Sequence, residues 1–175
     1  MELVSPSELY EQSFISFLND FIQNDPGNSE FYSEALVCFS SYVQSLNDQS
    51  KGINLPEGYV PCNHYWLVGE NNEIVGALRV RHNIDTPFLS HEAGHIGYDI
   101  APSFRKRGYG TQMLKLGLAK AKSLNLHSVL ITADEDNIAS RKIIESNGGI
   151  LEQVVMGEVF PNPVAKYWVN CYGNI

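Results

Sequence analysis

The chain has 175 residues, enough to bury a hydrophobic core, and we expect a single domain over residues 1–175. Its net charge of -8 disfavours a nucleic-acid partner, and no apolar run reaches the roughly 18 residues that a membrane-spanning helix needs, so no membrane partner is expected. Three widely spaced cysteines and the lack of a signal peptide predict reduced thiols in the cytoplasm, without a disulfide framework or a C-x-x-C metal site.

Apolar residues at helical spacing predict two helices before residue 50. Residues 25–28 end the first helix, whose common face carries Tyr10, Phe14, Phe17, Leu18 and Phe21. The second is predicted over about residues 29–46, with a common face of Tyr32, Leu36, Phe39, Val43 and Leu46. We interpret this aromatic stripe as core packing. The polar stretch 47–63, rich in Gly and Pro, predicts a long loop at the rim of a substrate site.

The rest of the chain predicts strands with two helices between them. Strands are predicted at 65–69, 74–81, 95–100, 128–133, 150–159 and 164–172, with helices at about 109–124 and 137–146 and a loop at 82–91. Strand and helix alternate in the middle while hairpins occupy both ends. This order predicts an α/β (α+β) fold with a mixed sheet and helices on its faces.

The stretch from Ile100 to Thr111 combines a strand end, a basic turn and a helix start. The turn contains Arg105, Lys106, Arg107, Gly108, Tyr109 and Gly110. The first N–H groups of a helix have no intrahelical partner and the helix dipole is positive there, so this order predicts an anion site. The two glycines let the backbone approach a phosphate closely. The turn matches neither a P-loop nor the G-x-G-x-x-G of a dinucleotide fold.

The charge distribution agrees with an anion at this turn. Residues 100–133 contain no acid and six of the twelve Lys and Arg side chains. Residues 1–73 contain eleven acids and one basic residue, Lys51. This asymmetry favours a phosphate ligand in the basic part and a cationic substrate near the acidic part. Solvated surface charge is the alternative for the N-terminal acids.

The R-x-x-G-x-G of this turn follows a strand that ends at Pro102 and begins a helix. With Ser128–Asp134, Asn137, Ser140 and Gly148, it resembles the acetyl-coenzyme A turn of the GNAT N-acetyltransferase superfamily, over about residues 60–170. The block 94–149 is most similar to an uncharacterised predicted-acetyltransferase branch. The resemblance implies a mostly antiparallel sheet whose central strand and next parallel strand splay apart to admit acetyl-CoA. It also implies transfer of the acetyl group to a primary amine by direct attack in a ternary complex.

The resemblance further implies roles for individual residues. The backbone N–H near Ile100 stabilises the developing oxyanion, Asn137 contacts the pantetheine arm, and Ser140 faces the same groove. The pyrophosphate is held around Arg105, Lys106, Arg107, Gly108, Tyr109, Gly110 and Thr111. For Asn137 a helix cap is the alternative role, and for the basic side chains a solvated turn.

The usual acid of the family is missing here. A Tyr commonly stands seven residues after the Asn, but this chain has Ile144, and Gly149 replaces a usual Phe. Tyr98 is the first alternative acid, with a core tyrosine as its other interpretation, and Tyr167 is a weaker one. Glu92 and His95 are candidate bases at the mouth of the central strand, and a water relay is the alternative.

Two other functions remain in view. One is a CoA-binding module with little catalysis. The other is a zinc peptidase, because residues 91–95 read H-E-x-x-H, but Gly94, the strand that follows and the missing third ligand argue against a metal. The acceptor is a small-molecule or peptide amine, and the loop acids Asp48, Glu57 and Asp85 favour a small cation. The late strands could pair in a homodimer.

Overall fold

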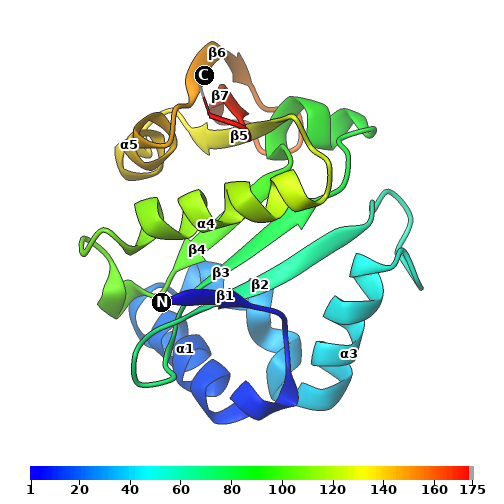
Figure 1. Cartoon of the computed structure of the whole chain (residues 1–175), viewed down its shortest axis with the longest axis vertical. Coiled ribbons are helices and arrows are strands. Elements are labelled where there is room, and N and C mark those ends of the chain that lie inside the picture. Colours follow the sequence, from blue (N-terminus) through cyan, green and yellow to red (C-terminus); the bar gives the residue numbers. More distant parts are fainter. Residues whose placement is uncertain (174–175) are drawn as a thin grey trace.

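The computed structural model describes residues 1–173, which form a layered α/β fold (Figure 1). Its helices are α1 (Glu11–Asn24), α2 (Pro26–Ser29), α3 (Phe39–Ser50), α4 (Tyr109–Ser123) and α5 (Ile138–Ser146). Short 3-10 turns are η1 (Glu8–Tyr10), η2 (Glu30–Leu36) and η4 (Pro102–Phe104), and η3 (Leu89–Ala93) is a π-helical turn. The strands are β1 (Glu2–Val4), β2 (Cys62–Val68), β3 (Ile74–Arg81), β4 (Ile96–Ile100), β5 (Ser128–Asp134), β6 (Ile150–Met156) and β7 (Pro163–Asn170).

The strands form two antiparallel sheets, ordered β1-β2-β3-β4 and β5-β7-β6. Helix α4 connects β4 to β5 and lies between the two sheets in Figure 1. A helical crossover of this kind is what two parallel neighbouring strands require. Because β4 and β5 are assigned to different sheets, the central strands separate, and the predicted mixed fold with splayed central strands is confirmed.

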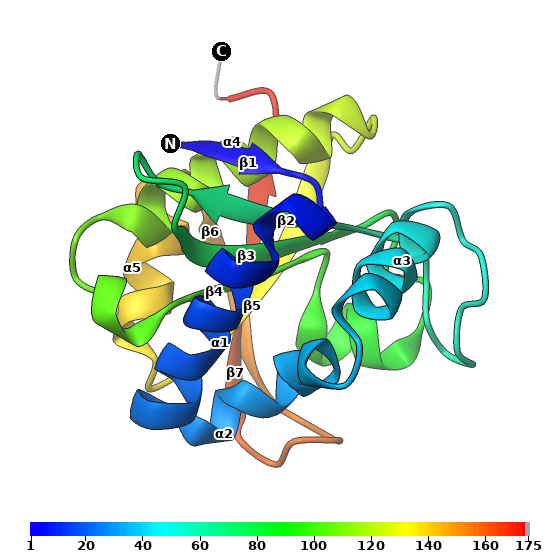
Figure 2. The same ribbon diagram turned by 90° about the horizontal axis from the view of Figure 1, so that it is seen from below.

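Two clusters of buried side chains cover the two faces of the first sheet. Helices α1 and α3 lie on one face (Figure 2), where the cluster is aromatic and includes Phe14, Phe17, Phe21, Tyr32 and Trp66. On the other face, α4 and the second sheet enclose an aliphatic cluster that includes Leu78, Ile96, Met113, Ile131 and Ile144. The predicted core face of the first helix is confirmed at Phe14, Phe17, Leu18 and Phe21, each at most 2% exposed.

The predicted helix over residues 29–46 is wrong. The chain instead forms the 3-10 helix η2, breaks at Val37 and Cys38, and begins α3 at Phe39. A 3-10 helix has three residues per turn, so Tyr32 and Ala35 share the buried face. Leu36, which the 3.6-residue period placed on that face, is 54% exposed. Tyr32 remains on the buried face, where its hydroxyl donates to Asp99 of β4 at 2.7 Å.

Among residues 1–173, no helix has the length and apolarity needed to cross a bilayer.

Candidate active site

The turn between β4 and α4 exposes a row of backbone N–H groups. Gly108 has a φ of +80° and caps α4, and the N–H of Gln112 donates to its carbonyl at 3.2 Å. Within residues 1–173, the N–H groups of residues 107–111 have no hydrogen-bond acceptor; we call these five groups the amide row. Nothing lies within 4 Å of a Cβ built at Gly108, so glycine is needed there for its left-handed conformation. Free N–H groups at the positive end of a 15-residue helix bind anions.

Gly110 has a different role from the one predicted from its spacing. It is buried, and a Cβ there would lie 2.5 Å from Cδ1 of Ile143 in α5. Its missing side chain therefore lets α4 and α5 approach each other, while its N–H remains part of the amide row.

The basic side chains of the turn are not equivalent. Arg105 donates to Oδ2 of Asp25 at 2.6 Å and, from Nε, to the carbonyl of Ile100 at 3.0 Å. Hydrogen bonds from Asn28 and from Arg105 lower the pKa of the Asp25 carboxyl. Arg105 thus ties the turn to the end of α1. Lys106 and Arg107 are exposed, and the Arg107 guanidinium lies 5.5 Å from the ring centroid of Phe104.

β4 and β5 meet at one pair of residues. The N–H of His95 donates to the carbonyl of Leu130 at 2.7 Å, and the N–H of Leu130 donates to Nδ1 of the His95 ring at 2.9 Å. The carbonyl of His95 is engaged elsewhere, because it accepts from the N–H of Arg81 at 2.8 Å. The imidazole therefore takes the place of a strand carbonyl at this junction. Burial, with the nearby charge of Arg81, lowers the pKa of His95 and so favours the neutral ring that can accept.

Beyond this junction the two strands turn free backbone groups toward each other. The N–H of Ala101 donates to Val75 of β3 at 3.0 Å, and antiparallel pairing alternates, so Tyr98 and Ile100 direct their N–H groups away from β3. On β5, the backbone N–H and C=O groups of Leu130 point toward β4. By the same alternation, those of Thr132 and Asp134 point into the gap. Within residues 1–173, no hydrogen bond crosses between β4 and β5 past His95 and Leu130. The gap thus has an unpaired polar edge on both sides.

The start of α5 closes one side of this gap. The side chain of Asn137 accepts from the N–H of Ser140 at 3.0 Å and caps the helix, so the capping role is present. The hydroxyl of Tyr98 lies 2.9 Å from Oγ of Ser140 and 3.3 Å from its carbonyl. Burial raises the pKa of Tyr98 to about 12, so its phenol stays protonated near neutral pH. Tyr98 is therefore a protonated hydroxyl that Ser140 holds at the start of α5.

Residues 28–148 match the profile of the Acetyltransferase (GNAT) family. The chain belongs to this family. It is accordingly an acetyl-CoA-dependent acetyltransferase, in agreement with the resemblance of the turn and the splayed strands. A comparison with curated protein sequences found no match.

Solved structures of acetyltransferases share its fold. RimL, a ribosomal L7/L12 alpha-N-protein acetyltransferase in complex with coenzyme A, is 19% identical, with 96% of this chain and 92% of that chain covered and a TM-score of 0.67. MccE, a microcin C7 self-immunity acetyltransferase in complex with acetyl-CoA and AMP, is 16% identical over 96% and 91%, with a TM-score of 0.69. A spermidine N-acetyltransferase SpeG chimera from Vibrio cholerae and hSSAT is 14% identical over 98% and 97%, with a TM-score of 0.61.

In this GNAT acetyltransferase the two candidate bases are engaged in holding the backbone. The carboxylate of Glu92 accepts the N–H groups of Glu158, Val159 and Phe160 at 2.6, 2.8 and 3.0 Å, which lowers its pKa against the opposing effect of burial. His95 uses Nδ1 to accept from Leu130. Neither arrangement presents a free basic atom to a substrate, so the geometry argues against both as the base.

The H-E-x-x-H stretch does not form a zinc-peptidase helix. Its first three residues lie in the five-residue turn η3, and the strand begins at Ile96. A nitrogen of the His91 ring lies 2.9 Å from the carbonyl of Met156, whereas His95 contacts Leu130. Among residues 1–173 no three His, Cys, Asp or Glu side chains are grouped as metal ligands. The segment instead holds β5 and the β6–β7 turn in place.

The position of the usual family acid is closed. Ile144 is fully buried in the aliphatic cluster, and a Cβ at Gly149 would lie 2.5 Å from its Cγ2. Tyr167, the weaker candidate, donates to Glu145 and accepts from Arg141, both at 2.8 Å, so α5 engages its hydroxyl. The hydroxyl of Tyr98 is also hydrogen-bonded, to Ser140 of α5, but Tyr98 lies on β4 itself, between residues whose backbone borders the gap.

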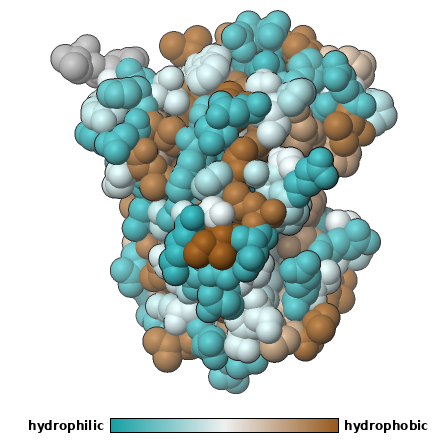
Figure 3. Space-filling model, turned by 90° about the vertical axis from the view of Figure 1, so that its right-hand side faces the viewer, coloured by the Kyte–Doolittle hydropathy of each residue, from teal (hydrophilic) through white to brown (hydrophobic). Residues whose placement is uncertain are grey.

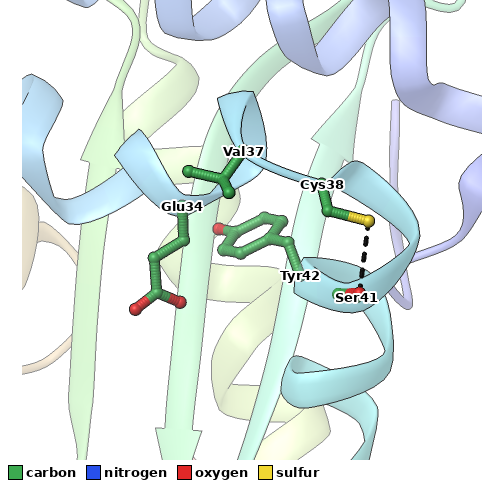
Figure 4. Close-up of a pocket in the computed structure, with 5 residues that line it drawn as sticks. All are labelled: Glu34, Val37, Cys38, Ser41 and Tyr42. Atoms are coloured by element: carbon green, nitrogen blue, oxygen red, sulfur yellow. Dashed lines mark hydrogen bonds between the residues drawn. The ribbon is translucent and has the colours of Figure 1, made fainter.

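A shallow pocket lies elsewhere, at the break between η2 and α3 (Figure 4). It is lined by Glu34, Val37, Cys38, Ser41 and Tyr42, and Ser41 donates to Sγ of Cys38 at 3.2 Å. Hydrogen bonds from Ser40 and Ser41 lower the pKa of the Cys38 thiol to about 7.

The face that Figure 3 shows mixes hydrophobic and hydrophilic residues and is indented between the upper and lower parts of the molecule.

Sequence reasoning missed three side chains on the face of β4 opposite Tyr98. Asp99 contacts both Tyr32 of η2 and Arg79 of β3. The period of two along β4 separates Asp99 from Ile96, Tyr98 and Ile100, which was the available signal. Tyr32, 67 residues away in the chain, gave no local sign of this contact.

Proposed function

We propose that this acetyltransferase holds the diphosphate of acetyl-CoA on the amide row, with its pantetheine arm in the gap between β4 and β5, and transfers the acetyl group to a primary amine. The observation that carries this proposal is the row of five free N–H groups next to two unpaired strand edges. The fit is chemical: the row offers donors and a positive helix end to an anion. The strand edges offer N–H and C=O groups to the amides of the arm.

The co-substrate supplies a thioester carbonyl to the attacking amine. The N–H groups of Tyr98 and Ile100 face the gap and donate to the carbonyl oxygen as negative charge develops there. Asn137 caps α5 with Oδ1, which leaves its Nδ2 to donate to the pantetheine arm, and Ser140 lies on the same side. Lys106 and Arg107 add positive charge at the amide row, while Arg105 holds the turn against α1.

Tyr98 is the proposed proton donor to the departing thiolate. Its hydroxyl is neutral near pH 7 and lies beside Ser140, which keeps it oriented. The proton that leaves the amine goes to water, since Glu92 and His95 are engaged by backbone groups. Attack is direct, in a ternary complex.

The acceptor is a small-molecule or peptide amine. Proteins of the same fold include a ribosomal-protein N-terminal acetyltransferase and a spermidine acetyltransferase, so both acceptor classes belong in a test. Binding of acetyl-CoA is measured by calorimetry, and thiol release is followed with spermidine, amino-acid amides and a peptide with N-terminal serine. Saturable thiol release with at least one amine is expected. Failure of acetyl-CoA to bind refutes the proposal.

A CoA-binding module is the second candidate, favoured by the burial of Ile144 at the position of the usual acid. The same two measurements separate it from the enzyme. Binding of acetyl-CoA without thiol release across the whole amine panel supports the module. Thiol release that Tyr98→Phe lowers at least about tenfold, with an unchanged Kd for acetyl-CoA, supports the enzyme with Tyr98 as its acid.

We also propose that the protein acts in the cytoplasm, without a metal ion, as a homodimer that pairs along β6. This strand is an edge of its sheet and exposes Ile150, Val154 and Met156 at 69, 41 and 60%. Val154→Lys places a charge in the middle of that edge. Sedimentation is expected to show a dimer for the parent chain and a monomer for the variant, and a monomer for both refutes the pairing.

A further inference from the structure

Asp99 lies next to the proposed reaction centre but on the opposite face of β4 from Tyr98. Its neighbours Tyr98 and Ile100 direct their N–H groups into the gap, and consecutive Cα atoms are only about 3.8 Å apart. The face of β4 that carries Tyr98 is covered by α4 and α5, which contribute side chains to the aliphatic cluster. The Asp99 side chain is 21% exposed, so its carboxylate is within reach of a molecule from solvent.

One carboxylate oxygen of Asp99 is held and the other is free. Oδ2 accepts from the Tyr32 hydroxyl at 2.7 Å and lies 3.5 Å from Nη1 of Arg79. Within residues 1–173, Oδ1 accepts no hydrogen bond. A carboxylate oxygen has room for more than one donor, so Oδ1 is available to an incoming N–H group.

Tyr32, which donates to Oδ2, is itself held in place by packing. Tyr32 is 4% exposed, and its ring centroid lies 6.0, 5.1 and 5.5 Å from those of Phe14, Phe17 and Phe21. Burial and the charge of Asp99 raise the pKa of Tyr32 well above its usual range, so it remains a donor. A side chain that is fixed by aromatic packing orients its hydrogen-bond partner at little entropic cost.

Arg79 reaches Asp99 because residue 97 has no side chain. A Cβ at Gly97 would lie 2.6 Å from Nε and 2.8 Å from Cζ of Arg79, so the guanidinium lies across β4 at this point. Arg79 also lies 5.9 Å from the ring centroid of Phe31. Its charge disfavours any cation that approaches over Gly97, so an incoming cation is directed to the Oδ1 side of Asp99.

We propose that Oδ1 of Asp99 binds the ammonium group of the acceptor and places its nitrogen beside the thioester carbon. A primary ammonium is the fitting class, because it is compact and offers three donors to a partly desolvated carboxylate. The ammonium then loses one proton to water before the neutral amine attacks. The inference rests on the proposed function, since it assigns the acceptor side of the same centre.

The test measures amine binding separately from cofactor binding. Butylammonium chloride is titrated into the coenzyme A-saturated protein, and backbone amide shifts are followed by NMR. Saturable shifts are expected at Gly97 and Asp99. The isosteric Asp99→Asn variant is expected to weaken this affinity at least about 30-fold, and its Kd for acetyl-CoA should stay within about twofold. Tyr32→Phe keeps the charge and should weaken amine affinity only about threefold.

Each result decides the inference. Equal butylammonium affinity in the parent chain and Asp99→Asn overturns it, and so does a loss of acetyl-CoA binding in parallel with amine binding, which marks a structural ion pair. Asp99→Ser repeats the measurement if the Asn variant does not fold. Asp99→Glu, which restores the charge, should recover part of the affinity. Failure of the parent chain to bind acetyl-CoA refutes the proposed function instead, and butylammonium is then titrated alone.

Discussion

Replacement of His95 tests the junction from which β4 and β5 diverge. His95→Leu keeps a side chain of similar size but removes Nδ1, so the N–H of Leu130 loses the acceptor that now lies at 2.9 Å. His95 is 6% exposed and Leu130 is 1% exposed, so water does not replace it. An unsatisfied buried N–H costs about 2 kcal/mol. In a chain of this length the corresponding decrease in Tm is about 4–8 °C.

His95→Asn is the matched control, because Oδ1 of Asn stands close to where Nδ1 of His stands. This variant loses the burial of the imidazole ring but keeps an acceptor for the N–H of Leu130. We expect it to lower the free energy of unfolding by about 1 kcal/mol. The first assay is thermal unfolding of both variants. The second is amide hydrogen exchange, in which Leu130 should exchange about 30-fold faster in His95→Leu than in the parent chain.

The junction should also affect cofactor affinity, because a gap with a loosened end must be reordered when the pantetheine arm binds. We expect reordering of the gap to cost about 1.4 kcal/mol of binding free energy in His95→Leu, which raises its Kd for acetyl-CoA about tenfold. In His95→Asn the Kd should rise less than about threefold. Equal effects of the two variants would refute the role of Nδ1. A destabilised His95→Leu with unchanged acetyl-CoA affinity would show that the junction stabilises the fold without shaping the gap.

Three further results are expected. Gly108→Asp should weaken acetyl-CoA binding about 30-fold more than its isostere Gly108→Asn, because a carboxylate about 5 Å from a phosphate costs about 2 kcal/mol; equal Kd values would contradict the amide row. Burial lowers the pKa of His64 to about 4, so the unfolded chain takes up its proton first as pH falls. Stability should therefore decrease between about pH 6.5 and 4, less steeply in His64→Gln, as measured by urea unfolding at each pH. Glu92→Gln should speed amide exchange at residues 158–160 about tenfold, with acetyl-CoA affinity retained.

The parts of the site that were predictable are local in the chain. Strand, turn, Gly108 and helix start follow one another within twelve residues, and each has its own physical signature. The sequence does not show what the turn packs against: Arg105 looked like a phosphate ligand, but its partner Asp25 lies 80 residues away. The same holds for Tyr32, whose position on a 3-10 helix follows from packing and not from the period of its neighbours.

Glu92 and His95 show why chemical type alone does not assign a catalytic role. Both have side chains suited to proton transfer, and both stand at the start of the central strand. In the fold, that start is also where two sheets and the β6–β7 turn must be joined, and each joint leaves backbone N–H groups in need of acceptors. A carboxylate and an imidazole meet that need. The proposed catalytic donors, in contrast, are backbone N–H groups that the fold leaves without partners.

Side chains that hold the backbone and side chains proposed to act in the reaction should respond differently to substitution around the gap. Variants of His95 or Arg105 change how well the backbone beside the gap is held, so their effects on stability and on cofactor affinity should change together. Tyr98 and Asp99 lie on opposite faces of β4, and variants of either are expected, from their proposed roles, to lower turnover or amine affinity with little change in Tm. A Tyr98→Phe enzyme that loses stability and thiol release in proportion would place Tyr98 with the first group and leave water as the source of the proton.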